Sequence, residues 1–368
     1  MRIAYVLTSL GIGGAERQVL ALAERMRARG HTVLLVVLRG CQPEEWPVTL
    51  DLVRLNMRKS PSGLVAGLWR ARRSLLGFHP DLIHSHVFPA NIAARLFRLS
   101  LPSATLLSTI HNVYEGPWPR MMAYQLTDFL SRHTTFVSQS AADRFVYLKA
   151  VPASKVSVLT NGIDIAEFAS SAERRARLRE QMGVREEFVW LATGRIAPAK
   201  DYPNLLRAFA QIMVAVPNAR LWIAGETSGS SSAELQAESG ASVRWLGLRR
   251  DMPALLDAAD GFVLASAWEG MPLVVGEAMA MEKLVVATDV GGVRELVGEA
   301  GVIVPAKNSD ALAAAMLDGI RREKEERGLL GCAGRKRIAD HFSIDAKADE
   351  WEALYCSLLA ENDEQLRE

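Results

Sequence analysis

The sequence predicts an α/β protein made of two consecutive halves, each with a parallel β-sheet between helices. Three observations support this fold class. Short apolar strands alternate with amphipathic helices along the whole chain. The strand, glycine turn and helix at the start of the chain recur near residue 188. The length of 368 residues also exceeds one ordinary domain and suits two.

The first half reads as a regular series of βα units. The segment TTFVSQSAADRFV, residues 134–146, should contain a strand, an N-cap at Ser138 or Ser140, and then a helix. The helix at 62–77 is amphipathic, and the turn signal Asn161-Gly162 closes the half. Strands are expected at 2–7, 31–38, 48–57, 81–88, 104–110, 134–137 and 156–159, with a further helix at 15–30.

The second half restarts the same pattern after a polar helix near 170–182. The Ser- and Gly-rich stretch SGSSSAE at 228–234 is expected to be mobile. Helices are expected over roughly 308–340, followed by a final helix at 341–361. Strands are expected at 188–193, 219–226, 243–247, 262–267, 284–288 and 301–305.

The stretch FVLASAWEGMPLVVGEAMAMEK, residues 262–283, reads as a strand, a loop and a helix. Pro272 suits a first helical position, whose N–H has no intrahelical partner. The backbone N–H groups of Gly270, Met271, Leu273 and Val274 would then converge at a helix N-terminus. Unsatisfied donors and the positive end of the helix dipole favour phosphate there. The sequence therefore predicts an anion site at this loop.

Two carboxylates bracket this loop, Glu269 in the turn and Glu277 eight residues later in the helix. A rise of about 1.5 Å per residue separates them by roughly 12 Å along the axis. Paired carboxylates of glycosidases lie only about 5 to 9.5 Å apart, so the spacing disfavours a hydrolase pair. It suits a grip on two sugars joined by a diphosphate, with Glu277 at the ribose and Glu269 at the transferred sugar.

Two glycine turns supply further candidate residues. In the loop Gly11-Ile-Gly-Gly-Ala-Glu16, Gly13 and Gly14 would let a substrate approach the backbone at a helix start. The loop lacks the GxGxxG pattern of dinucleotide-binding proteins, which disfavours NAD. In the second half Arg195 and Lys200 flank a turn, and a guanidinium fork with a mobile ammonium matches diphosphate oxygens.

Three histidines lie at the ends of predicted strands. The period of two places His84 and His86 on one face of a strand, but no third ligand accompanies them, so a metal site is not predicted. Carboxyl ends of parallel strands line the ligand crevice of doubly wound sheets. His86 and the nearby Asn91 could therefore face an acceptor, and His111 occupies a similar strand end.

Charge is divided unequally along the chain. Residues 1–165 hold 19 Lys and Arg against 10 Asp and Glu, whereas residues 166–368 hold 24 against 32. The basic half is expected to meet an anionic partner. The helix at 62–77, with Trp69, Arg70, Arg72 and Arg73, could lie on an anionic membrane surface, or simply present a solvated face.

The location of the protein is predicted from what the sequence lacks. No apolar run reaches the roughly 18 residues that a membrane span needs, and the N-terminus enters a strand without a secretory apolar region. We expect a cytoplasmic protein, with peripheral contact at the inner membrane face as an option. Three widely spaced cysteines indicate neither a disulfide framework nor a zinc site. No nucleic-acid partner is expected.

Taken together, these motifs resemble glycosyltransferase family 4, the large family of retaining transferases with the GT-B fold. The matching segments are Gly-Gly-Ala-Glu16, the strand-end His111, Gly-Arg195 with Lys200, Glu269-x7-Glu277, and the hinge Asn161-Gly-Ile-Asp. The resemblance covers nearly the whole chain. His111-Asn-Val-Tyr-Glu115 is only loosely similar to the family, which leaves the roles of Asn112 and Glu115 open.

The resemblance implies two Rossmann-like domains facing across a deep cleft. An acceptor domain would span 1–163, with the final helix 343–361 packing back on it, and a nucleotide-sugar domain would span 164–342. His111 and Glu269 would be catalytic, Glu277 would bind the ribose and Gly247 the nucleobase. The implied diphosphate site comprises Gly13, Gly14, Arg195, Lys200, Gly270, Met271, Leu273 and Val274. Possible acceptor contacts are Glu16, His86 and Asn91.

The implied reaction is transfer of a hexose or N-acetylhexosamine from a nucleoside diphosphate sugar, with retention of configuration. The expected acceptor is a hydroxyl group, on a lipid-linked glycan or a polysaccharide of the cell envelope. No Asp-x-Asp triplet occurs, so neither a divalent metal nor another cofactor is expected. Two alternatives stay open at this point: a nucleotide-sugar epimerase of the same fold, and a catalytically silent nucleotide-sugar sensor.

Overall fold

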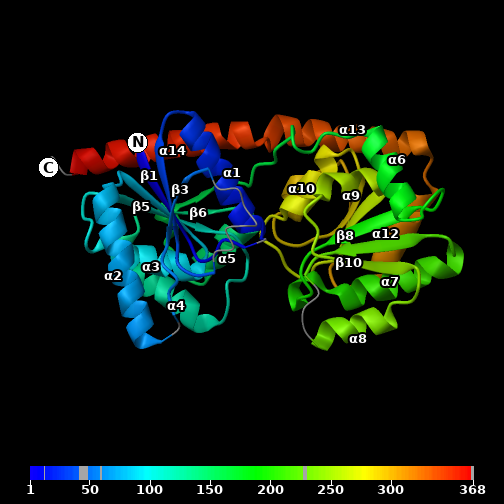
Figure 1. Cartoon of the computed structure of the whole chain (residues 1–368), viewed down its shortest axis with the longest axis horizontal. Helices are drawn as coiled ribbons and strands as arrows, with labels where there is room; N and C mark the ends of the chain where they lie inside the picture. The colour runs from blue at the N-terminus through cyan, green and yellow to red at the C-terminus, as the bar shows by residue number, and fades with distance from the viewer. Residues whose placement is uncertain (12, 41–48, 59, 227–229, 366–368) are drawn as a thin grey trace. The chain divides into compact units, whose positions relative to one another are not determined.

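The computed structural model describes residues 1–11, 13–40, 49–58, 60–226 and 230–365. It divides the chain into two compact units (Figure 1). The N-terminal unit comprises Met1–Gly162 and Ile344–Glu368, and the C-terminal unit comprises Ile163–Ser343. The sequence puts the division one residue later, after residue 163. In the structure the Ile163 backbone N–H already donates to the Phe342 carbonyl, at 2.7 Å, within the C-terminal unit.

The N-terminal unit is a seven-stranded sheet flanked by helices, with strand order β3-β2-β1-β4-β5-β6-β7. Every pairing in it is parallel. The strands are β1 (Arg2–Leu7), β2 (Thr32–Val37), β3 (Asp51–Arg54), β4 (Leu82–His86), β5 (Thr105–Ile110), β6 (His133–Phe136) and β7 (Val156–Val158). The helices are α1 (Gly14–Ala28), α2 (Pro61–Phe78), α3 (Phe88–Arg98), α4 (Trp118–Thr127), α5 (Gln139–Tyr147) and α14 (Ile344–Gln365).

The C-terminal unit is a parallel six-stranded sheet in the order β10-β9-β8-β11-β12-β13. Its strands are β8 (Val189–Thr193), β9 (Arg220–Ala224), β10 (Val243–Gly247), β11 (Gly261–Leu264), β12 (Leu284–Thr288) and β13 (Val302–Val304). Its helices are α6 (Ala172–Gln181), α7 (Tyr202–Ala215), α8 (Ser230–Glu238), α9 (Met252–Ala258), α10 (Leu273–Ala280), α11 (Val293–Val297), α12 (Ser309–Arg321) and α13 (Lys324–His341).

Both sheets have the strand order of a doubly wound Rossmann fold, which confirms the predicted fold class. In each sheet the chain runs outward from a central strand and then restarts on its other side. The reversal lies between β1 and β4 in one unit and between β8 and β11 in the other. Ligands of such sheets bind at the carboxyl ends of the strands at this reversal. The loops after these strands are therefore where a site is expected.

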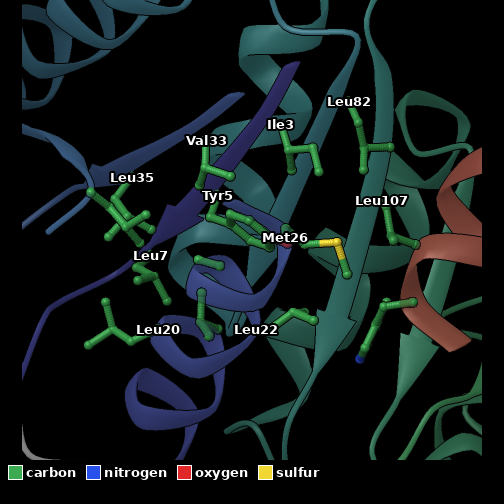
Figure 2. Close-up of a cluster of buried hydrophobic side chains, with 14 of the residues drawn as sticks. Ile3, Tyr5, Leu7, Leu20, Leu22, Met26, Val33, Leu35, Leu82 and Leu107 are labelled. Carbon is green, nitrogen blue, oxygen red and sulfur yellow. The ribbon is translucent and has the colours of Figure 1, made fainter. Parts of the chain in front are cut away.

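Alternating side chains of β1 contribute to two separate cores, one on each face of the sheet. Ile3, Tyr5 and Leu7 of β1 pack with α1 and α14 on one face. Ala4 and Val6 of the same strand pack with α2 and α3 on the other face. Figure 2 shows the first core, where the side chains of β1 and β2 meet Leu20, Leu22 and Met26. This alternation follows from the side-chain period of a strand.

The last helix of the chain completes this first core. Trp351, Tyr355 and Leu358 of α14 are buried against the side chains of β1 and α1. Ion pairs flank the contact: Arg25 Nε lies 3.0 Å from Asp345 Oδ1, and Arg29 Nη1 lies 3.0 Å from Glu352 Oε2. The final segment of the chain is therefore an integral part of the N-terminal unit.

Local structure differs from the sequence interpretation in four places. Helices α3 and α4 were not expected. The stretch interpreted as mobile contributes to α8, with residues 227–229 outside the described part. Pro272 is the N-cap of α10, so the helix begins at Leu273, one residue later than expected. Of the two candidate caps of α5, Ser138 is the N-cap, and its hydroxyl accepts from the Ala141 N–H at 3.4 Å.

Candidate functional site

Backbone hydrogen bonds join the loops at the reversal point of the C-terminal sheet. The loop after β8 meets the loop after β11 where the Ala267 N–H donates to the Ala199 carbonyl, at 2.8 Å. The loop after β12 meets the same loop where the Gly292 N–H donates to the Gly270 carbonyl, at 2.6 Å. Three loops from separate strands therefore form one ordered surface at the carboxyl ends of the strands.

The structure brings Lys200 and Glu269 together within this surface. Lys200 Nζ donates to Glu269 Oε1 at 2.7 Å, and the Ser266 hydroxyl donates to the same oxygen at 2.7 Å. Both side chains of the ion pair are largely buried, with 22% and 12% of their area exposed. Thr288, fully buried on β12, donates its hydroxyl to the Ser266 carbonyl at 2.7 Å. The Glu269 carboxylate is thereby fixed from two strands.

Glycines at the end of β8 and β9 make room for the Lys200 side chain. Gly194 has φ +144°, and a Cβ there would lie 2.6 Å from Lys200 Cε. A Cβ at Gly225 would lie 2.0 Å from the Gly194 carbonyl oxygen. Tyr202 donates its hydroxyl to that same carbonyl at 2.7 Å. The glycine before Arg195 is thus required for the approach of the lysine stem to the backbone.

Helix α10 presents its N-terminus in the same set of loops. Leu273 and Val274 occupy its first two positions, where backbone N–H groups have no intrahelical acceptor. Glu277 lies one turn further along and is 2% exposed. Of the residues expected at the diphosphate, Gly270 and Met271 precede the cap Pro272 on the same loop. Their roles as ligands stay predictions.

Arg195 and Gly247 lie at the same sheet edge, after β8 and at the end of β10, with β9 between these two strands. Arg195 is exposed and makes no hydrogen bond or ion pair with the described part of the chain. Gly247 ends β10 with φ +64°, and its carbonyl accepts from the Gly225 N–H at 2.8 Å. A guanidinium in this position is available to an incoming anion.

The Gly291 position gives a sharp test of how tightly these loops pack. Gly291 has φ +56°, and a Cβ there would lie 2.4 Å from the Glu269 carbonyl oxygen. We expect Gly291→Ala to lower the free energy of unfolding by about 2 kcal/mol, because it adds both backbone strain and overlap. Denaturant unfolding measures this. Gly183→Ala is the matched control, since Gly183 has φ +64° with open space around it. Equal losses in the two variants would contradict the tight packing.

In the N-terminal unit the side chain of Glu16 fills the space beside the glycine turn after β1. A Cβ at Gly13, the N-cap of α1, would lie 2.2 Å from Glu16 Oε2. Glu16 Oε1 accepts from the Ser9 hydroxyl at 3.1 Å. Gly14 begins the helix and is exposed. The Glu16 carboxylate therefore sits over the helix start that was expected to receive a substrate.

The three strand-end histidines form one cluster. His84 and His86 share a face of β4, as the period of two predicts, with ring centroids 3.9 Å apart. His86 Nδ1 and His111 Nε2 are 3.0 Å apart. His84 bridges Tyr355 on α14 and Thr109 on β5, at 2.7 and 2.6 Å. Side-chain contacts through His84 and His86 thus link α14 to the candidate catalytic residue His111.

Burial holds all three histidines neutral at physiological pH. Loss of solvation lowers the pKa of His111 to about 4. Loss of solvation, with repulsion from the neighbouring imidazoliums, lowers the pKa of His84 and His86 well below the ordinary value. A neutral imidazole at His111 can accept or donate one hydrogen bond to an uncharged sugar hydroxyl.

Glu115, whose role the sequence left open, is a buried acid beside His111. Its Oε1 accepts from the His111 backbone N–H at 3.4 Å, and its Oε2 accepts from the Tyr124 hydroxyl at 2.7 Å. Desolvation raises its pKa to about 7, although these donors and Arg120 act in the opposite direction. Asn91 Nδ2 donates to the Tyr124 hydroxyl at 2.9 Å. Glu115 thus shapes the loop that carries His111.

His86 and Asn91 are buried, with 2% and 0% of their area exposed. In this structure they contact His111, Thr109 and Tyr124. Their role at an acceptor stays a prediction. The sequence did not point to Ser266, Thr288, Tyr124 or Tyr355; the partners of Thr288 and Tyr355 are distant in sequence, and Tyr124 lies on a helix that was not expected. For Ser266 the sequence did hold one signal, a polar residue just after an apolar strand.

The described residues offer neither a metal cluster nor a membrane-spanning helix. No group of three or more His, Cys, Asp or Glu side chains there is arranged to hold a metal ion. Within those same residues, none of the helices combines the length and the apolar character needed for a membrane crossing. Helix α2 does expose Trp69, Leu64 and Val65.

Comparison with known proteins was made on the sequence and on the fold. The model "Glycosyltransferase Family 4" matches residues 12–167, and "Glycosyl transferases group 1" matches residues 187–321. A D-inositol 3-phosphate glycosyltransferase of Corynebacterium efficiens is 30% identical over 306 residues, covering 76% of this chain and 72% of that protein. A UDP-Gal:alpha-D-GlcNAc-diphosphoundecaprenol alpha-1,3-galactosyltransferase of Escherichia coli is 24% identical over 298 residues, 76% of each chain.

A solved structure extends the similarity to the whole fold. Anabaena Alr3699/HepE in complex with UDP-glucose is 22% identical, with a TM-score of 0.83, over 96% of this chain and 99% of that one. It shares the fold of two Rossmann-like units. The sequence matches and this fold agree on one assignment: the chain is a glycosyltransferase that belongs to family 4.

Proposed function

We propose that the protein transfers a hexose or N-acetylhexosamine, with retention of configuration, from a nucleoside diphosphate sugar to a hydroxyl group of a lipid-linked glycan or polysaccharide. The C-terminal unit would bind the donor and the N-terminal unit the acceptor. The UDP-glucose complex of HepE and the diphosphoundecaprenol acceptor in the name of the Escherichia coli relative support these two substrate classes.

The observation that carries the proposal is the fixed Glu269 carboxylate beside Lys200 and the start of α10. The leaving group of the donor is already a diphosphate, so no acid needs to protonate it. Its growing negative charge needs stabilisation instead, which a preorganised cation and helix N–H donors supply. Lys200 is already held 2.7 Å from Glu269, so the lysine does not have to reorganise when the reaction occurs. Glu269 can accept a hydroxyl of the transferred sugar.

His111 and Glu277 would complete the donor site in this proposal. The buried Glu277 would accept from ribose hydroxyls, and the neutral His111 would bind the transferred sugar. His86, 3.0 Å from His111, fixes the orientation of that ring. Arg195 is exposed and would close on the diphosphate when the donor binds.

A two-step experiment tests this function. Thermal shifts with UDP, GDP, TDP and ADP sugars identify the donor base, since a ligand that binds only the folded state raises Tm. The stabilising donor is then incubated with glycan acceptors, and the anomeric configuration of the product is read by NMR. We expect an α product from an α donor. Conversion of the donor without any acceptor would instead indicate an epimerase, and binding without turnover would indicate a sensor.

Turnover is expected to need no divalent metal, since Lys200, Arg195 and the α10 N-terminus can neutralise the diphosphate. We expect kcat to change less than twofold when EDTA is added to the purified enzyme. A control with excess Mg²⁺ over EDTA excludes an effect of the chelator itself. Loss of activity in EDTA that Mg²⁺ restores would contradict this expectation.

Helix α2 supplies the proposed membrane contact. Its exposed Trp69 and Val65 lie on the same helix as the exposed cations Arg72 and Arg73. Apolar side chains with neighbouring cations favour the surface of an anionic bilayer. Such a contact would bring the enzyme to an acceptor carried on lipid.

A further inference from the structure

A basic pocket opens at the carboxyl end of β3, apart from the loops described above. It has a volume of about 600 Å³ and lies between the β3–α2 loop and the first half of α2. Its polar lining consists of Arg54, Asn56, Arg58, Ser60, Ser62 and Arg70. None of the described residues that line it is acidic. Three guanidinium groups around one hollow create a strong positive potential.

Packing of the backbone shapes this pocket. Asn56 turns the chain in the left-handed region, with φ +46°. A Cβ at Gly63 would lie 2.6 Å from Arg58 Cβ, so the glycine lets the first turn of α2 approach the Arg58 backbone. Arg70 Nη2 donates to the Leu55 carbonyl at 2.6 Å, which fixes the floor of the pocket. The packing of these backbone segments therefore places the three arginines around one pocket.

Two of the cations, Arg54 and Arg58, face solvent in the described part of the chain. Neither forms a hydrogen bond or ion pair with the described residues. Side chains that stabilised the fold would be expected to have acidic or carbonyl partners, as Arg25 and Arg29 do. Guanidinium groups left open beside hydroxyl donors match a phosphate, because they can bind its oxygens in a bidentate manner.

The position of the pocket relates it to the acceptor side of the reaction. The sheet order β3-β2-β1-β4-β5 places it on the same edge as His111, four strands away. At about 4.8 Å between strands this separation is roughly 19 Å. A single sugar ring does not span that distance. A phosphate bound here would therefore belong to an extended acceptor, several groups away from the hydroxyl that reacts.

We propose that this pocket binds the phosphate or diphosphate group of the acceptor, so that the enzyme selects acceptors whose glycan is linked through phosphate. The proposal rests on the proposed transferase function. It names a ligand chemistry and a site on the N-terminal unit, whereas the donor diphosphate is assigned to the C-terminal unit. The pocket would hold the linkage end of the acceptor while the distant hydroxyl reaches the donor sugar.

Pyrophosphate binding provides the first test, by isothermal titration calorimetry with the donor site filled by the best nucleoside diphosphate. We expect Arg54→Gln with Arg58→Gln to weaken pyrophosphate binding at least tenfold without altering the affinity for the nucleotide. The control Arg72→Gln with Arg73→Gln removes the same charge from exposed positions of α2 that do not line the pocket. An affinity within twofold of the parent in the pocket variant would overturn the proposal.

Transfer kinetics provide the second test. Two acceptors are compared. In the first, a diphosphate links the sugar to a short alkyl chain; the second is the neutral alkyl glycoside of the same sugar. We expect the pocket variant to raise KM at least tenfold for the first acceptor and to leave KM for the second unchanged. Equal effects on both would overturn the proposal. Arg54→Lys with Arg58→Lys should retain much of the binding, and Tm shows whether each variant folds.

Binding to lipid vesicles distinguishes phosphate binding in this pocket from a general attraction of the enzyme to anionic membranes. With phosphatidylglycerol vesicles, the control pair at Arg72 and Arg73 should weaken binding at least as much as the pocket pair. If the pocket variant alone lost vesicle binding and kept pyrophosphate binding, the pocket would be a lipid-surface contact and the proposal would be wrong. If no nucleotide sugar bound while pyrophosphate still bound at Arg54 and Arg58, the transferase function would be wrong and the anion site would stand.

Discussion

Lys200→Ala is expected to reduce kcat/KM by roughly 30-fold to several thousandfold, equivalent to about 2 to 5 kcal/mol of lost transition-state stabilisation. The lysine is largely buried and lies 2.7 Å from Glu269 Oε1. Its removal leaves the departing diphosphate poorly paired, and it also leaves the Glu269 carboxylate without its cation. Steady-state kinetics with the donor found by thermal shift measure the loss.

A nucleotide series shows whether the loss arises at the diphosphate. Lys200→Ala should weaken binding of the nucleoside diphosphate at least tenfold while the affinity for the bare nucleoside changes little. Lys324→Ala is the matched control, because Lys324 is an exposed lysine in the same unit. A double-mutant cycle with Glu269→Gln measures the coupling within the ion pair. Activity of Lys200→Ala within threefold of the parent would defeat the diphosphate assignment.

Acidification from pH 6.5 to pH 4 is expected to destabilise the N-terminal unit through its buried histidines. The pKa of His111 is about 4 in the folded protein and 6.5 in the unfolded chain. Between these values the unfolded chain binds the proton and the folded protein does not, so the free energy of unfolding falls as pH falls. The 2.5 units correspond to about 3 kcal/mol. His84 and His86, whose pKa values are also lowered, add losses of the same sign.

Glu115 acts in the opposite direction over much of this range. Its pKa is raised from 4.5 to about 7, so its contribution to stability is fully present below pH 4.5 and is lost as pH rises through 7. Glu115→Gln should therefore lose more stability on acidification than the parent does.

Urea unfolding at pH 7, 6, 5 and 4 measures these slopes, and His111→Gln should show a shallower acid slope than the parent. Exposed groups outside the cluster titrate equally in every variant, so they cancel in the comparison. Identical slopes for the parent, His111→Gln and Glu115→Gln would show that the cluster titrates as it does in the unfolded chain.

The strands and their ligand-facing ends could be predicted because their signals are local. Apolar runs ending in glycine turns placed Gly194 and Gly270 in the loops after strands, and the period of two paired His84 with His86. The contact of Lys200 with Glu269 joins residues 69 apart in sequence, and no pattern on either strand predicts it. The same reason hid Thr288, which reaches the Ser266 carbonyl because β11 and β12 are neighbours.

The missed helices have a proline in the first turn but no side-chain N-cap. Val87, the N-cap of α3, has φ +70° and no side-chain cap, and Pro117 precedes α4 without one either. Without a capping side chain, the proline alone was too weak a signal to place either helix. Because α4 was not predicted, the sequence gave no reason to place Tyr124 against Glu115, or to expect a carboxyl whose pKa is raised to about 7.

Helix α14 has a consequence for the order in which the protein is made. The ribosome completes the C-terminal unit, an unbroken segment Ile163–Ser343, before residues 344–365 emerge. Until then the groove between β1 and α1 lacks Trp351 and Tyr355, and His84 lacks its phenolic partner. The half of the enzyme that is translated first is therefore the half that matures last, and its apolar surface stays open to chaperones until α14 has emerged.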